Sequence, residues 1–102
     1  MNIHEFIWND DIIYHIARHN VDPEEVEEVC FGKPIIVKSR QASKGLNPTY
    51  YALGKTESGR YLVVMFIYFK NSRAMVVTAR DMDEKERKYY RRQSNNDQQN
   101  HT

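Results

Sequence analysis

The chain has 102 residues, 40% of them hydrophobic, and a formal net charge of +1. This length suits one domain with one core and excludes a second domain of ordinary size. The longest apolar run, residues 61–69, is too short for a membrane-spanning helix, and the chain starts without a signal-peptide pattern, so we expect a cytoplasmic protein without a membrane partner.

The N-terminal third predicts a short strand and a first helix. Residues 3–8 alternate loosely between apolar and polar side chains, as in a strand. Asn9 or Asp10 can cap the helix, which we expect to end near Asn20, a residue type that tolerates a left-handed backbone. The apolar stripe expected to face the core consists of Ile12, Ile13, Ile16 and Ala17.

A second helix, predicted from Pro23 to Phe31, has the clearest local signature. Asp22 and Glu25 have the spacing of a capping box, and Pro23 occupies the first helical position. Gly32 is expected to stop the helix.

The periodicity becomes extended after Pro34. A basic loop at residues 39–48 and a tight turn at residues 56–59 separate runs of strand type. The predicted strands cover residues 35–37, 49–55, 60–69 and 75–79. The run at residues 60–69 is apolar on both faces, which predicts a central strand.

The last strand leads through Arg80 into a charged helix ending near Arg92. Both Asp81 with Glu84 and Asp83 with Glu86 have capping-box spacing, so either pair can start this helix. A guanidinium and free backbone N–H groups can then face one anion.

The order β-α-α-β-β-β-β-α predicts an α+β fold, with a small antiparallel sheet, two N-terminal helices and a C-terminal helix. We expect one domain at residues 1–92 and a disordered polar tail at residues 93–102, which lacks apolar side chains.

Charge is divided unevenly along the chain. Residues 1–31 carry eight acidic side chains and one Arg, whereas the remainder carries 14 Lys and Arg and six acids. The basic part either presents a surface to an anionic partner or is neutralised by the acidic part, and the sequence leaves both open. Tyrosines interleaved with these cations suit stacking on unpaired bases. We expect at least half of these tyrosines to pack in the core instead, with Tyr50 and Tyr90 as the exceptions.

Two other groups of side chains favour ordinary structural roles. His15 and His19 have a spacing found in metal sites, but no second cluster supplies further ligands, so an exposed helix face is the preferred interpretation. We predict neither a metal nor a cofactor. Cys30 is the sole cysteine and is expected to pack in the core.

Four segments together resemble the BrnT family of toxins from bacterial type II toxin-antitoxin pairs, over roughly residues 5–92. They are FIWND, ARHNVDPEEVEEVCF, LGKTESGRYLVV and VVTARDMDEKERKYY, the last being the most specific. The resemblance implies a RelE-like fold and a metal-independent endoribonuclease that inhibits translation and growth. It also implies neutralisation by a small antitoxin that binds DNA, so that DNA is contacted only through the antitoxin complex.

Site residues follow from this resemblance position by position. The resemblance maps the basic and aromatic site to His19, Arg60, Arg80 and Tyr90, with Arg18 in place of a family Lys and Glu86 retained. Thr49 stands where the family has an Arg, and Arg40, Lys44 or Lys55 can substitute.

The predicted site residues have three expected roles: binding the phosphate, transferring a proton and stacking on a nucleobase. Arg60 and Arg80 are predicted to hold the phosphate, and His19 or Tyr90 to transfer the proton. Base stacking is assigned to Tyr50. Further substrate contacts are predicted for Arg18, Lys55, Glu86 and Arg91. The alternative is a module that binds RNA or protein through the same basic face without catalysis, and metal binding by His15 and His19 is a third, lesser possibility.

Overall fold

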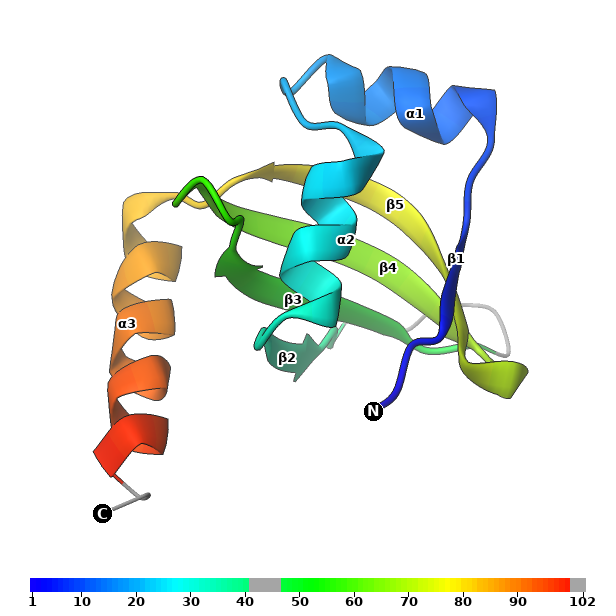
Figure 1. Ribbon diagram of the computed structural model, residues 1–102. Coiled ribbons are helices and arrows are strands. Elements are labelled where there is room, and N and C mark those ends of the chain that lie inside the picture. The colour runs from blue at the N-terminus through cyan, green and yellow to red at the C-terminus, as the bar shows by residue number, and fades with distance from the viewer. Residues whose placement is uncertain (41–46, 100–102) are drawn as a thin grey trace.

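The computed structural model describes residues 1–40 and 47–99. This part of the chain confirms the α+β class and the predicted element order, with three α-helices beside a five-stranded sheet (Figure 1). The helices are α1 (Asp10–Ala17), α2 (Pro23–Phe31) and α3 (Glu84–Gln99). The strands are β1 (Glu5–Ile7), β2 (Ile35–Lys38), β3 (Thr49–Lys55), β4 (Tyr61–Phe69) and β5 (Arg73–Asp81), with a 3₁₀ turn at Lys70–Ser72 before β5.

The strands lie in the order β1-β5-β4-β3-β2, so β4 is central as predicted. The pairs formed by β2 to β5 are antiparallel, but β1 pairs with β5 in parallel. The expectation of a purely antiparallel sheet is therefore wrong, and the sheet is mixed. Short connections force neighbouring strands to run antiparallel, whereas the long connection from β1 to β5 through both helices leaves the direction of β1 free.

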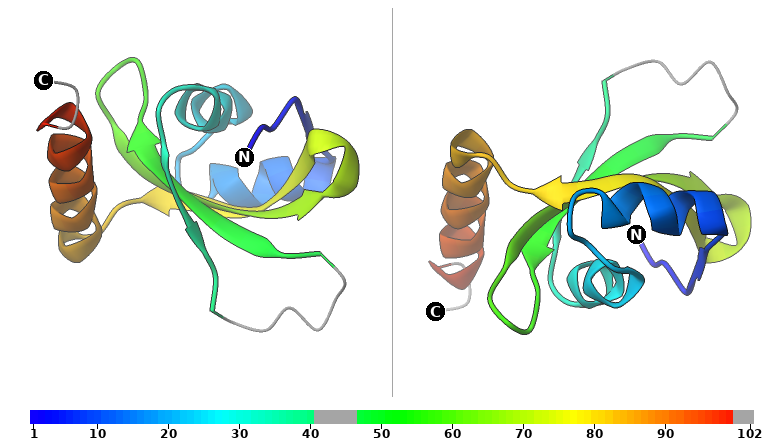
Figure 2. Two further views of the ribbon diagram at one scale, coloured as in Figure 1. Left: turned by 90° about the horizontal axis from the view of Figure 1, so that it is seen from below. Right: turned by 90° about the horizontal axis from the view of Figure 1, so that it is seen from above.

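Helices α1 and α2 cover one face of the sheet, as the nearly edge-on views in Figure 2 show. Their buried Ile16, Val26 and Val29 pack with Phe66 and Val64 of β4 in the main core. The predicted stripe of α1 is only partly buried, because Ile13 and Ala17 remain exposed. No helix within residues 1–40 and 47–99 has the length and apolar character needed to cross a membrane.

Capping groups fix the ends of these helices where the sequence placed them. The Asn9 side chain accepts from the Ile12 N–H at 2.9 Å, and Asp22 and Glu25 form the reciprocal capping box. Helix α1 ends at Ala17, and the turn after it contains Asn20 in the left-handed conformation with φ of 59°. The chain then turns directly into α2.

Helix α3 stands at the end of the sheet, on the face that α1 and α2 leave uncovered (Figures 1 and 2). Its capping box uses Asp83 and Glu86, whose side chains each accept from the other's backbone N–H at 2.8 Å. Buried Met82 joins Leu53 and Val63 in a second, smaller core. The helix continues to Gln99, beyond the expected boundary at Arg92. Extending an existing helix costs far less than starting one, so polar residues can follow the capped first turn.

Candidate functional site

A pocket of about 500 Å³ lies between the uncovered sheet face and α3. Its apolar and aromatic part consists of Val37, Tyr51, Leu53, Val63 and Tyr89, and its charged part of Arg40, Arg80, Lys85 and Glu86. Small-molecule and nucleotide sites combine an apolar lining with a few placed polar groups in this way. Three cations against one carboxylate give the pocket a positive balance, which favours an anionic ligand.

Arg80 and Glu86 form the central ion pair of this pocket. Two parallel hydrogen bonds join them, from Arg80 Nη1 to Glu86 Oε1 at 2.8 Å and from Nη2 to Oε2 at 2.9 Å. The Arg80 bonds lower the pKa of Glu86, and the bonded carboxylate raises the pKa of Arg80. Arg80 also donates to the Asp81 carbonyl, but these bonds leave its Nε–H and one Nη2 hydrogen for a ligand.

Arg60 is held in a different way, although the sequence predicted the same role for it. Its side chain donates to the carboxylates of Glu25 and Asp81 and to the carbonyls of His19 and Asn20. These partners come from α2, the end of β5 and the turn after α1. All five guanidinium hydrogens are thereby engaged, and the Asp81 bond is the main cause of the raised pKa of Arg60. The network leaves no hydrogen-bond donor for phosphate.

The two arginines lie on opposite faces of the sheet because of strand alternation. Arg80 and Asp81 are neighbours on β5, so their side chains point to opposite sides. Asp81 faces the helices and binds Arg60, whereas Arg80 faces α3 and lines the pocket. The two arginines predicted to hold one phosphate are therefore separated. Arg60 belongs to an ion-pair network on the helix-covered face, and Arg80 lines the pocket on the other face.

His19 and Arg18 are exposed residues at the end of α1. The ring of His19 contacts the His15 ring edge-on at 5.5 Å, and His15 Nε2 lies 3.0 Å from Thr78 Oγ1. Neither Arg18 nor His19 lines the pocket beside α3. Among the described residues, no group of three or more His, Cys, Asp and Glu side chains is arranged to hold a metal ion.

The tyrosines divide between core and pocket. Tyr50 stacks on Phe66 with ring centres 5.9 Å apart on the helix-covered face, whereas its neighbour Tyr51 lines the pocket. Ala52 and Gly54 share the face of Tyr50, and small residues where a helix approaches closely are a signal that could have distinguished the two tyrosines. Tyr90 packs edge-on against Tyr61 in the smaller core, and Tyr89 is the tyrosine of α3 that lines the pocket.

Lys55 and Arg91, two of the predicted substrate contacts, lie outside the pocket. Lys55 Nζ is 5.4 Å and Arg91 Cζ is 5.7 Å from the centre of the Tyr61 ring. Of the candidates to replace the family Arg at Thr49, Arg40 lines the pocket and Lys44 lies outside the described residues. Three residues that line the pocket had no predicted role: Tyr51, Lys85 and Tyr89.

Cys30 packs against the core, as expected. Burial and the nearby Glu27 raise the pKa of its thiol to about 12, which keeps the thiol protonated.

Comparison with known proteins supports the resemblance drawn from the sequence. A family model described as "Ribonuclease toxin, BrnT, of type II toxin-antitoxin system" matches residues 8–86. The matched range includes Arg80 and Glu86 and ends before Tyr89. The comparison with curated protein sequences gives no match.

Proposed function

Because the chain belongs to the BrnT family of ribonuclease toxins of type II toxin-antitoxin systems, we propose that it cleaves RNA in the pocket beside α3 and does so without a metal ion. The observation that carries this proposal is the bidentate Arg80–Glu86 pair in a pocket that also offers Tyr51 and Tyr89. The pair supplies a charge donor and a carboxylate at one place, and the tyrosines supply aromatic faces for a base.

Metal-independent cleavage of RNA needs three functions. A base takes the proton of the 2′-OH, a cation stabilises charge that develops on the phosphate oxygens, and a donor protonates the leaving 5′ oxygen. Arg80 fits the second function through its remaining N–H donors. Arg40 and Lys85 add positive charge at the same pocket.

Glu86 is the best-placed base in the pocket. It is the one carboxylate among the described residues that line the pocket, and Arg80 and the capping box hold it in position. Its lowered pKa keeps it ionised near neutral pH but also makes it a weaker base than a free carboxylate, so the proposal rests on its position. Tyr89 lines the same pocket and carries a hydroxyl that can donate to the leaving oxygen. His19 and Tyr90, proposed from the resemblance for proton transfer, are the alternative proton carriers and can be tested separately.

The proposed setting is the bacterial cytoplasm, where cleavage of RNA would inhibit translation and growth. A small DNA-binding antitoxin would neutralise the toxin, so that DNA is reached only through the complex of the two. Expression of the chain with and without the product of the neighbouring reading frame tests this partnership. Growth arrest that the neighbour fails to relieve would argue against that partner.

Cleavage of a defined RNA by the purified protein in the presence of EDTA tests the central proposal. The wild-type protein should cleave, and Arg80→Ala should slow cleavage about a hundredfold or more, since removing one such donor raises a barrier by about 2.7–4 kcal/mol in other enzymes. Arg73→Ala is a matched control, because Arg73 also lies on β5 and pairs with a carboxylate, Glu5, away from the pocket. Equal rates for wild type and Arg80→Ala would contradict the assignment.

Glu86→Gln tests the base while keeping the side chain's shape. General bases contribute about 10²- to 10⁴-fold in rate, so cleavage should fall by at least the lower figure.

The second candidate function, RNA binding without catalysis, is favoured by the positive pocket alone. It predicts that RNA binds to the wild-type protein and stays intact, with no arrest of growth.

A further inference from the structure

Three cations outside the pocket converge on one aromatic ring. Lys55 Nζ, Arg87 Cζ and Arg91 Cζ lie 5.4, 5.3 and 5.7 Å from the centre of the Tyr61 ring, within the range of cation–π contacts. We call Lys55, Tyr61, Arg87 and Arg91 the Tyr61 cluster. Arg87 and Arg91 also line a cavity of about 430 Å³ that shares no residue with the pocket containing Arg80.

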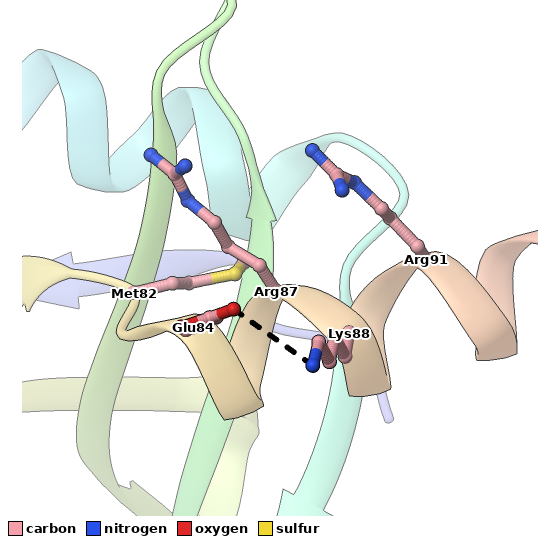
Figure 3. Close-up of a pocket in the computed structure, with 5 residues that line it drawn as sticks. All are labelled: Met82, Glu84, Arg87, Lys88 and Arg91. Carbon is pink, nitrogen blue, oxygen red and sulfur yellow. Dashed lines mark ion pairs between the residues drawn. The ribbon is translucent and has the colours of Figure 1, made fainter.

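The cations of this cluster form no ion pair with any residue in the described part of the chain. Within the described ranges, no ion pair joins Lys55, Arg87 or Arg91 to a carboxylate. The nearby Lys88 differs, because it pairs with Glu84 at 3.8 Å. Figure 3 shows Arg87 and Arg91 extending together to one side of α3, away from the Glu84–Lys88 pair.

Such an arrangement favours a ligand with more than one negative charge. Distances of 5.3 to 5.7 Å from one ring centre place any two of the three cations at most about 11 Å apart, so physiological salt, which screens over about 8 Å, reduces their mutual repulsion only in part. A bound anion removes that repulsion. Exposed cations set against aromatic rings are also the usual components of surfaces that follow a single nucleic-acid strand.

The position of the cluster connects it to the proposed cleavage pocket. On β3, Tyr51 and Leu53 line the pocket, and Lys55 is the next side chain on the same face of the strand. Tyr51 and Lys55 are four residues apart, or about 13 Å along the strand. On α3, Tyr89 of the pocket is two residues from both Arg87 and Arg91, a spacing that points side chains to opposite sides of a helix, so the pocket and the cluster lie on the two flanks of α3. An RNA strand held in the pocket would have to pass around α3 to bring its later phosphates to the cluster.

We propose that the Tyr61 cluster binds backbone phosphates of the RNA substrate beyond the nucleotides held in the pocket, on the other flank of α3. This inference rests on the proposed ribonuclease function and adds a second contact surface to it. The cluster carries no group suited to the chemical step, so it contributes to binding of long substrates and leaves the cleavage of very short ones unchanged.

Binding of a 2′-O-methyl RNA oligonucleotide, which lacks the attacking hydroxyl, measures the cluster apart from catalysis. The double variant Arg87→Gln/Arg91→Gln should weaken binding about tenfold near 0.1 M salt. It should also reduce the slope of log affinity against log salt by roughly 1.4, since each phosphate contact of a single strand contributes about 0.7. Lys55→Gln, on a different element, should reduce the slope by about 0.7.

Lys70→Gln/Arg73→Gln is the matched control, because it removes the same charge from residues that line neither the pocket nor the cavity. It should keep at least half of the wild-type affinity. Equal weakening by the two double variants, wild-type binding by the cluster variant, or no RNA binding by the wild-type protein would overturn the inference. Failure of the ribonuclease proposal is seen separately, as a cleavable RNA that the wild-type protein binds and leaves intact.

Discussion

The surroundings of Arg60 and of α3 use positive charge in opposite ways. At Arg60, four protein groups from three parts of the chain take up every guanidinium hydrogen, and the arginine joins the helices to the sheet. Arg87 and Arg91 of α3 lie near the Tyr61 ring, and neither has a carboxylate partner among the described residues. Arg80, on β5 opposite α3, keeps two hydrogens that no group in the same described residues accepts. A basic residue therefore indicates a binding site only when its hydrogen-bond donors are not already satisfied within the protein.

Loss of Arg60 should produce the largest change in stability. Arg60→Ala leaves Glu25, which is 21% exposed, without its main partner. Breaking a fully buried pair costs about 3–5 kcal/mol, and partial exposure reduces the expected loss here to about 2 kcal/mol. Thermal denaturation should show a melting temperature lowered by about 10 °C. Arg73→Ala, which breaks an exposed pair, should lower it by a few degrees at most. Equal melting temperatures for these two variants would remove the distinction between the regions.

Tyr51 and Tyr50 provide a smaller contrast between the pocket and the core. Tyr51→Ala should weaken binding of a non-cleavable RNA about tenfold, because stacking of a base on an aromatic ring contributes about 1–3 kcal/mol. Tyr50→Ala removes a ring packed on Phe66, so it should lower the melting temperature and leave binding by the folded protein unchanged. Weaker binding by Tyr50→Ala alone would reverse the assignment.

Glu86 should contribute a modest, pH-dependent part of the stability. Arg80 lowers its pKa in the folded protein below the ordinary 4.5, so the ionised carboxylate stabilises the fold above that pH. This stabilisation is lost as the pH falls through the lowered pKa. Wild type should therefore exceed Glu86→Gln in melting temperature at neutral pH, and the two should converge in acid. A constant difference across the titration would show that the pair with Arg80 does not depend on ionisation of Glu86.

The smallest effects are expected for the residues that the structure places outside the pocket. Tyr90→Phe keeps the packing against Tyr61 and removes only the hydroxyl, and His19→Ala changes an exposed side chain. Both variants should cleave RNA within about threefold of the wild-type rate, well below the contribution of a general acid or base. A hundredfold loss in either would return proton transfer to that residue.

Local patterns predicted the elements of this fold because their causes are local. The capping box of α2, the left-handed Asn20 and the apolar run of β4 depend on residues close in sequence. The parallel pairing of β1 with β5 depends on chain segments about 70 residues apart, which a pattern does not specify. The family resemblance identified Arg80 and Glu86 together with Arg60. Only the fold shows that Glu25 and Asp81 already satisfy Arg60, and that Tyr51 replaces Tyr50 in the pocket.

RNA is proposed to bind between the sheet and α3, whereas Arg60 holds the helices in place. NMR titration of the isotope-labelled protein with a 2′-O-methyl RNA oligonucleotide tests this proposal most directly. We expect the largest changes in backbone amide signals at Tyr51, Arg80 and the first turns of α3, with small changes at His19, Glu25 and Arg60. Changes concentrated around His19 and Arg60, with the pocket beside α3 unaffected, would contradict it.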